Sequence, residues 1–105
     1  MSQFIAYANP NPATRKLFPY LLDIQSDLLD ELRTTVVVPL CPATMVGEVV
    51  ISKLSPAVEI DSRKYLVFTQ QIAAVDRTAL GKKVCDLSGS RQTIIAALDF
   101  VISGI

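Results

Sequence analysis

The chain has 105 residues, half of them apolar, and its 10 Lys and Arg residues balance 10 Asp and Glu residues. This length fits a single domain (1–105) with one hydrophobic core, and the lack of net charge disfavours direct nucleic-acid binding by this chain alone. No apolar run reaches the ~18 residues of a membrane span and no signal-peptide pattern is visible, so we expect a cytoplasmic protein.

The residue types exclude several common catalytic and metal sites. The chain has no histidine, which removes the usual general base near neutral pH and the commonest zinc ligand. Its four glycines are scattered and form no phosphate-binding loop. Cys41 and Cys85 lack motif spacing and are expected to stay unpaired in the cytoplasm. We therefore predict no cofactor, no metal site and no catalytic residue.

The first part of the chain predicts two strands separated by a loop. Gln3–Ala8 begins the fold as a strand, and residues 9–15 form an exposed loop because its prolines lack donors and its asparagines favour turns. Leu17–Gln25 alternates between apolar and polar residues, which indicates a strand with one face in water. Asp23 falls on that wet face, and Pro19 indicates a bulge or an unpaired edge.

The middle of the chain combines a turn, a central strand and an ambiguous segment. Ser26–Asp30 holds two leucines between small polar residues, so both leucines either form an apolar turn tip or point inward. Thr34–Leu40 is rich in β-branched residues and predicts a central strand that bulges or ends at Pro39. Within 42–55, Thr44–Ile51 fits a short helix or a strand.

The next segments predict a hairpin and one more strand. Ala57–Ile60 and Lys64–Thr69 pair around Asp61–Arg63. Ile72–Val75 is a last short strand, followed by a polar connection over 76–83. Six or seven short strands before one helix indicate a mostly antiparallel β domain with the helix laid across it.

The C-terminal segment has the clearest helical pattern. We predict that Ser90 caps the helix with its hydroxyl and that Gly104 ends it. One face of this helix is apolar and must be covered: Ile94, Ile95, Leu98, Val101, Ile102 and Ile105, with Ala97 at its edge. The final isoleucine either completes the core or forms a recognition tip, and the helical pattern leaves both readings open.

Two groups of polar residues could carry chemistry. The carboxylates of Asp23, Asp27 and 30–31 could form an acid pair or a weak divalent-cation site, although a solvated edge is the favoured interpretation. Arg33 with the following Thr34 and Thr35 could serve phosphodiester cleavage with a carboxylate base, although a charged strand entry is favoured.

The chain resembles the CcdB family of bacterial toxins from toxin–antitoxin modules over nearly its whole length. The resemblance rests on these segments: the start Met-x-Gln-Phe-x-x-Tyr, Leu22–Asp30, Val37–Leu40, Leu54–Ile60 and the terminal Gly104-Ile105. It implies a mostly β fold, an SH3-like antiparallel barrel with a small extra sheet and a C-terminal α-helix.

The resemblance also implies a function that needs no catalysis. Family members act as homodimers that bind the DNA gyrase A subunit and trap the enzyme on cleaved DNA. A CcdA-like antitoxin neutralises the toxin, and operator DNA is bound only through the toxin–antitoxin complex, which represses its own operon.

Carried over by position, the resemblance implies three groups of contact residues. The gyrase contacts are Leu28, Leu29, Asp99, Ile102, Ser103, Gly104 and Ile105, and the leucine turn and the chain end are expected to lie together as one exposed patch. The antitoxin contacts are Asn9, Asn11, Thr14 and Arg15, and the dimer contacts are Ala97 and Val101. Ser103 departs from the family pattern, which has tryptophan there, so we expect weaker or differently anchored gyrase binding.

Two alternative functions accompany this interpretation. An endoribonuclease of the MazF/Kid kind shares the fold and would depend on Arg33 with a nearby carboxylate. A non-toxic relative would bind the antitoxin without arresting growth.

Overall fold

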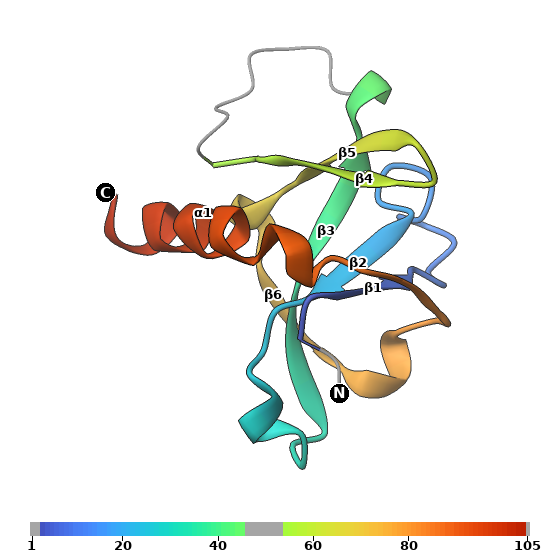
Figure 1. Ribbon diagram of the computed structural model, residues 1–105. Coiled ribbons are helices and arrows are strands. Elements are labelled where there is room, and N and C mark those ends of the chain that lie inside the picture. The colour runs from blue at the N-terminus through green and yellow to red at the C-terminus, as the bar shows by residue number, and fades with distance from the viewer. Residues whose placement is uncertain (1–2, 46–53, 105) are drawn as a thin grey trace.

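The computed structural model describes residues 3–45 and 54–104, which form one antiparallel sheet and one α-helix. The strands are β1 (Ile5–Ala8), β2 (Tyr20–Asp23), β3 (Thr34–Pro42), β4 (Ala57–Ile60), β5 (Arg63–Val67), β6 (Ala73–Asp76) and β7 (Lys83–Asp86), and the helix is α1 (Arg91–Ser103). The strand order is β4-β5-β3-β2-β1-β7, and β6 also pairs with β3. The sheet curls, and the start of α1 lies against it (Figure 1), which confirms the mostly β fold with a C-terminal helix.

The long strand β3 pairs with two different strands along one of its edges. Its pairing with β6 ends at Val37 and its pairing with β5 begins at Leu40. Pro39 lies between these two pairings, so its missing N–H falls where β3 passes from one partner to the next. The prediction that the strand bulges or ends at Pro39 is wrong, because β3 runs on to Pro42. Among the described residues, β6 belongs to the same sheet through its pairing with β3, so the expected small extra sheet is not separate from the main one.

The polar face predicted for the second strand is wrong at Asp23, whose side chain is 0% exposed. The Thr35 hydroxyl donates to Asp23 Oδ1 at 2.7 Å, and the Gln25 N–H donates to the same oxygen at 3.1 Å. Asp23 Oδ2 is also buried and has no hydrogen-bond partner among the described residues. Asp23 therefore belongs to the interior rather than to a solvated edge, and local hydrogen bonds offset part of the cost of burying its carboxylate.

The β4–β5 hairpin forms where it was predicted. Asp61 and Ser62 both adopt positive φ, at 53° and 65°. Two such residues fit the type I′ turn, whose twist matches that of the two strands. Residues 46–53, which include most of the ambiguous segment Thr44–Ile51, lie outside the described residues.

Both ends of α1 lie where the sequence placed them, although the start is built differently. Ser90 immediately precedes the helix, but its side chain makes no capping hydrogen bond within the described structure, so the predicted capping role is wrong. The chain instead enters through a 3-10 turn, where the Ser88 N–H donates to the Asp86 carboxylate at 2.8 Å. Gly104 ends the helix as predicted, with φ of 76° and its N–H donating to the Phe100 carbonyl at 2.9 Å.

Only the first half of the apolar helix face is covered. Ile94 and Ala97 are fully buried, and Ile95 and Leu98 pack partly against the core. Ile102, in contrast, is 79% exposed. The expectation that the whole face is covered is wrong because the end of α1 extends past the sheet (Figure 1). No helix in the described part of the chain is long and apolar enough to span a bilayer.

Gly81 provides a test of the packing beside β1. Its N–H donates to the Ala8 carbonyl oxygen at 2.8 Å, and a Cβ on Gly81 would lie 2.7 Å from that same oxygen. Because this oxygen belongs to the backbone, Gly81→Ala is expected to lower the free energy of unfolding by ~1–3 kcal/mol. Chemical denaturation would measure the loss.

The matched control is Gly89→Ala, because a Cβ at Gly89 would meet nothing within 4 Å. This change is expected to stay within about 0.5 kcal/mol of the wild type. Equal effects at both glycines would contradict the close approach of Gly81 to β1.

Candidate target-binding surface

The turn between β2 and β3 exposes leucines rather than burying them. Asp27–Leu29 forms a 3-10 turn, η1, whose Leu28 N–H donates to the Ser26 hydroxyl at 3.2 Å. Leu28 is 94% exposed, Leu29 is 46% exposed and the nearby Leu32 is 49% exposed. The alternative in which both leucines of this turn point inward is therefore wrong. We call residues 27–32 the leucine turn.

The backbone of the leucine turn is hydrogen-bonded by the side chain of Arg77, a residue that the sequence analysis did not single out. Its Nε donates to the Leu32 carbonyl at 2.7 Å and its Nη2 donates to the Leu29 carbonyl at 3.2 Å. The Arg77 N–H also donates to the Arg33 carbonyl at 2.9 Å, which places this arginine beside the turn. At the other end, the Gln3 N–H donates to Asp27 Oδ1 at 2.9 Å. Nothing in the local pattern around Arg77 signals this role.

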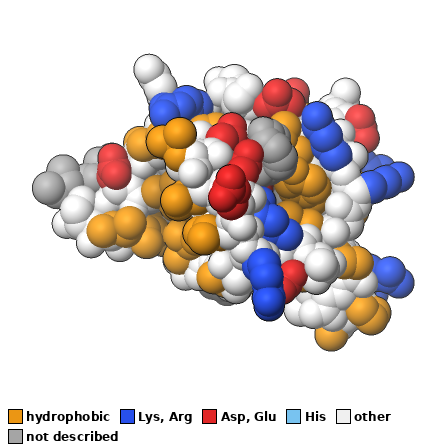
Figure 2. All heavy atoms as spheres, turned by 90° about the horizontal axis from the view of Figure 1, so that it is seen from below, with side chains coloured by type: hydrophobic (Ala, Val, Ile, Leu, Met, Phe, Trp, Pro, Cys, Tyr) orange, Lys and Arg blue, Asp and Glu red, His pale blue; other side chains and the backbone are white. Residues whose placement is uncertain are grey.

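The side chains of the leucine turn line an open groove of about 410 Å³. Its lining residues are Asp27, Leu28, Leu29, Asp30, Glu31 and Leu32. Figure 2, which views the molecule from below, shows hydrophobic side chains beside acidic ones on this face, with Lys and Arg side chains close to them. The groove therefore presents apolar surface together with negative charge.

The exposed end of α1 forms a second apolar tip. Ile102 carries its apolar surface, and Asp99, Ser103 and Gly104 are also exposed. The Ser103 hydroxyl donates to the Asp99 carbonyl at 2.7 Å, so it is engaged within the helix. Ile105, the other predicted contact at this end, lies outside the described residues.

The two apolar tips do not adjoin within one chain. Figure 1 shows the leucine turn at the lower end of the molecule, below β2 and β3, whereas the end of α1 projects to one side. The expectation that they form one patch is therefore wrong for the monomer. The tips are separate because they leave the sheet in different directions.

The loop after β1 contains the four predicted antitoxin contacts, and one of them is structural. Asn9 is buried, and its amide donates to the Thr14 hydroxyl at 3.0 Å and to the Phe18 carbonyl at 2.8 Å. Its carbonyl oxygen accepts from the Asn11 N–H at 3.1 Å. Asn9 thus shapes the loop, while Asn11, Thr14 and Arg15 are exposed on it.

The two predicted dimer contacts differ in what they can offer to another copy. Ala97 lies on the face of α1 that is buried in the monomer core, so it has no surface left for a partner. Val101, one turn further along, is half-buried. Of these two residues, only Val101 therefore has surface left for a contact between the helices of two copies.

The arginine–threonine group does not converge on one reacting point. The Thr35 hydroxyl is buried and donates to Asp23, so it is turned away from Arg33 and Thr34, which are exposed. Asp76 is a carboxylate close enough to sense the charge of Arg33. The Thr78 N–H, then the Thr78 hydroxyl, and also Arg33 lower the pKa of Asp76. A lowered pKa makes this carboxylate a weaker general base at neutral pH.

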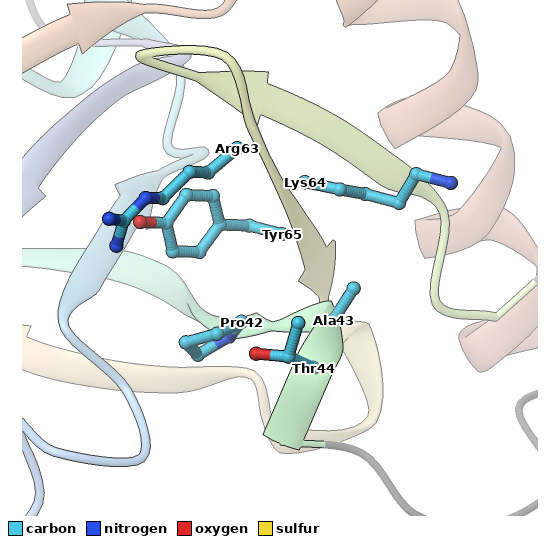
Figure 3. A pocket seen from close by; sticks show the side chains of 6 residues that line it. All are labelled: Pro42, Ala43, Thr44, Arg63, Lys64 and Tyr65. Atoms are coloured by element: carbon cyan, nitrogen blue, oxygen red, sulfur yellow. The ribbon is translucent and has the colours of Figure 1, made fainter.

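A second pocket, of about 400 Å³, lies between the end of β3 and the start of β5. Its lining residues are Pro42, Ala43, Thr44, Arg63, Lys64 and Tyr65, of which Lys64 points away from the Arg63 and Tyr65 side chains (Figure 3). The Tyr65 ring packs edge-on against Tyr20 at 5.2 Å between centroids. Burial, followed by the neighbouring Tyr65 hydroxyl, raises the pKa of Tyr20. No sequence motif pointed to this pocket.

The role of Arg77 leads to a prediction for the leucine turn. Arg77→Ala removes the two side-chain hydrogen bonds to Leu29 and Leu32. Because a hydrogen bond to a charged group contributes ~1.5–3 kcal/mol, amide hydrogen exchange in residues 28–33 is expected to accelerate about tenfold or more. Arg33→Ala removes the same charge from an exposed neighbour and should leave this exchange unchanged. Equal exchange in the Arg77 variant and the wild type would contradict the bracing role.

Comparison with known proteins places the chain in a family. The sequence model of the family described as "CcdB protein" matches residues 3–104. A solved endoribonuclease in complex with its cognate antitoxin, from a mycobacterial species, superposes with a TM-score of 0.74 at 13% identity, covering 97% of this chain and 94% of that one. The Mycobacterium tuberculosis toxin MazF-mt6 superposes with a TM-score of 0.69 at 14% identity, covering 95% of this chain and 96% of that one. At such low sequence identity, these structural likenesses show a shared fold and nothing more. The family model, in contrast, shows membership of a family, because it matches nearly the whole sequence. The chain therefore belongs to the CcdB family, the toxin component of toxin–antitoxin modules.

Proposed function

We propose that this toxin poisons DNA gyrase by binding its A subunit and stabilising the complex with cleaved DNA. The observation that carries the proposal is the exposure of Leu28 and Ile102, at 94% and 79%, on two tips of the molecule. Exposed apolar patches commonly mark an interface. Together with the family, these tips support binding rather than catalysis as the mode of action.

The mechanism requires only a difference in affinity between two states of gyrase. A ligand that binds the cleaved complex more tightly than the resealed one shifts the population toward the cleaved complex. The toxin itself then makes and breaks no covalent bond. Its contribution is the apolar surface of the leucine turn and of the end of α1.

The toxin acts in this proposal as a homodimer. The two tips lie apart on one chain, so a second copy would bring further tips to the same target. Val101 is the predicted dimer residue with surface left to contact a second helix, because Ala97 is already buried. Pairing through α1 would set the spacing of the exposed Ile102 side chains.

Ser103 sets the expected strength of binding. An aromatic hot-spot side chain is worth about 2 kcal/mol or more, and serine supplies no such ring. The Ser103 hydroxyl is moreover bonded to the Asp99 carbonyl. Ile102 is then the large apolar anchor on the described end of the helix, and we expect poisoning to be weaker than with a tryptophan at this position.

A CcdA-like antitoxin is the proposed regulator. The exposed loop residues Asn11, Thr14 and Arg15 are its proposed contacts, held in shape by Asn9. A solved structure with the same fold contains its cognate antitoxin, which supports a partner of this kind. Operator DNA would be bound through the toxin–antitoxin complex, since the toxin has no net charge.

Controlled expression in two bacterial strains tests the proposal. Growth arrest is expected in cells with normal gyrase and rescue in cells with a poison-resistant gyrase A subunit. In vitro, the purified toxin should increase linear plasmid DNA produced by gyrase. Growth arrest that is equal in both strains would refute gyrase as the target.

The second candidate is an endoribonuclease, and the observation that favours it is the fold shared with a solved endoribonuclease at a TM-score of 0.74. Here it would depend on Arg33 and Asp76 without the buried Thr35. RNA cleavage by the purified protein without gyrase, lost in Arg33→Ala, would favour this candidate. The third candidate, a non-toxic relative, predicts antitoxin binding with no growth arrest.

A further inference from the structure

The pocket between the end of β3 and the start of β5 forms where these two strands diverge. Their pairing ends at Pro42 and Tyr65, and β3 then leads into a 3-10 helix, η2 (Ala43–Met45). The residues of β5 before Tyr65 therefore pair with β4 but not with β3 in the described structure. The space beside them measures about 400 Å³, which falls in the range of about 300–1,000 Å³ typical of small-molecule sites.

Arg63 supplies the charged group of this pocket. Arg63 and Tyr65 are two residues apart on β5, so their side chains share one face, whereas Lys64 points to the other (Figure 3). Arg63 is exposed and makes no ion pair with a carboxylate of the described residues. Pro42 and Thr44 lie across the pocket from the Arg63 and Tyr65 side chains (Figure 3).

Tyr65 provides a neutral donor beside this charge. Its ring packs edge-on against Tyr20, with 5.2 Å between the ring centroids. Burial raises the pKa of Tyr20, a hydrogen bond with Tyr65 and the charge of Asp61 raise it further, and Arg63 opposes them. Tyr20 therefore stays protonated at neutral pH. Because a protonated Tyr20 can donate to the Tyr65 oxygen, the Tyr65 hydroxyl hydrogen is left for a ligand.

The charges around the pocket favour a ligand with a single negative charge. A guanidinium can bind a carboxylate through two parallel hydrogen bonds. Asp61 is not a lining residue, but it is near enough for its charge to act on Tyr20. A second negative charge on the ligand, as on a phosphate, would be repelled by this carboxylate.

We propose that this pocket binds a small organic monocarboxylate, with its carboxylate on Arg63 and the Tyr65 hydroxyl and its apolar body against Pro42 and Ala43. Such a site, mostly apolar with a few polar groups that fix orientation, is the usual design of a small-molecule pocket. None of its lining residues belongs to the leucine turn, the loop after β1 or α1. The inference therefore does not rest on gyrase as the target.

Three ligands with the same ring system test the pocket in the full-length toxin. At neutral pH, naphthoate carries one negative charge, naphthamide carries none and naphthyl phosphate carries more than one. Each is titrated into the toxin and followed by backbone NMR. We expect naphthoate to shift the signals of residues 43–44 and 63–65 and to saturate with a Kd of about 1 mM. It should bind about tenfold more tightly than naphthamide and at least as tightly as the phosphate.

Two neighbouring variants locate the charge that matters. Arg63→Gln is expected to weaken naphthoate binding about tenfold and to leave naphthamide binding unchanged. Lys64→Gln, the matched control, removes the same charge from the opposite face and should stay within about twofold of the wild type. Asp61→Asn is expected to tighten naphthoate binding.

Several results would overturn the inference. These are a lack of saturable naphthoate binding, equal binding of naphthoate and naphthamide, tighter binding of the phosphate, or signal changes away from the pocket. Equal losses in Arg63→Gln and Lys64→Gln would also refute it, because the attraction would then come from the overall charge and not from the pocket.

Discussion

Leu28→Asp is expected to abolish most gyrase-dependent DNA cleavage while leaving the melting temperature unchanged. Leu28 is almost fully exposed, and its 3-10 turn buries none of its residues. The substitution therefore removes no core contact, but it places a charge where the target would bury an apolar side chain. A loss of ~2.8 kcal/mol in binding corresponds to about a hundredfold weaker affinity. Linear plasmid formation by gyrase, measured over a range of toxin concentrations, gives this ratio.

The matched control for this prediction is Leu17→Asp. Leu17 is also exposed, at 42%, but lies in the connection between β1 and β2. The same chemical change there should leave DNA cleavage within about threefold of the wild type, since scattered surface leucines carry little binding energy. If both variants lose activity equally, the leucine turn is not a specific contact. If Leu28→Asp unfolds the protein, its exposed placement is wrong.

Ile94→Ala is expected to destabilise the fold strongly. Ile94 is fully buried and belongs to a core cluster that includes residues of β1, β2, β3, β4 and β5. Removing three carbons from such a site leaves a cavity and costs ~2–5 kcal/mol. For a domain of this size, the melting temperature should fall by roughly 10 °C or more. Thermal unfolding followed by circular dichroism would measure the change.

The same substitution eight residues later provides the contrast. Ile102→Ala acts on the same helix, but the side chain is exposed, so stability should change by no more than about 0.5 kcal/mol. Gyrase binding, however, should weaken, because this side chain is the apolar anchor next to Ser103. Similar destabilisation by both variants would show that the end of α1 is packed like its beginning and would remove the second tip from the proposed interface.

Local sequence signals predicted most of the strands, the hairpin and the end of the helix. Asp61 and Ser62 mark the turn between two alternating strands, and Gly104 marks a helix end, because each depends on the backbone preferences of one or two residues. The family resemblance likewise came from contiguous segments. At Ser90 the local signal was only partly correct. Ser90 precedes the helix as its residue preference predicts, but its side chain makes no capping hydrogen bond within the described structure.

Pairing between strands that are distant in the sequence decided the features that these local signals predicted incorrectly. Pro39 remains inside a strand because β3 changes partner at that position, and Asp23 is buried because Thr35, on the neighbouring strand, supplies a donor. Both outcomes depend on residues brought together by the sheet, which a reading of one strand at a time does not contain.

The sequence by itself determined the family, the mostly antiparallel architecture and the leucines as candidate contacts, because these reside in composition, periodicity and short motifs. The tertiary structure alone decided that the leucine turn faces water, that Arg77 holds it from a strand end more than forty residues away, and that the two tips point apart. The physical reason is that a pattern fixes which residues share a face, whereas exposure depends on what the rest of the chain places against that face.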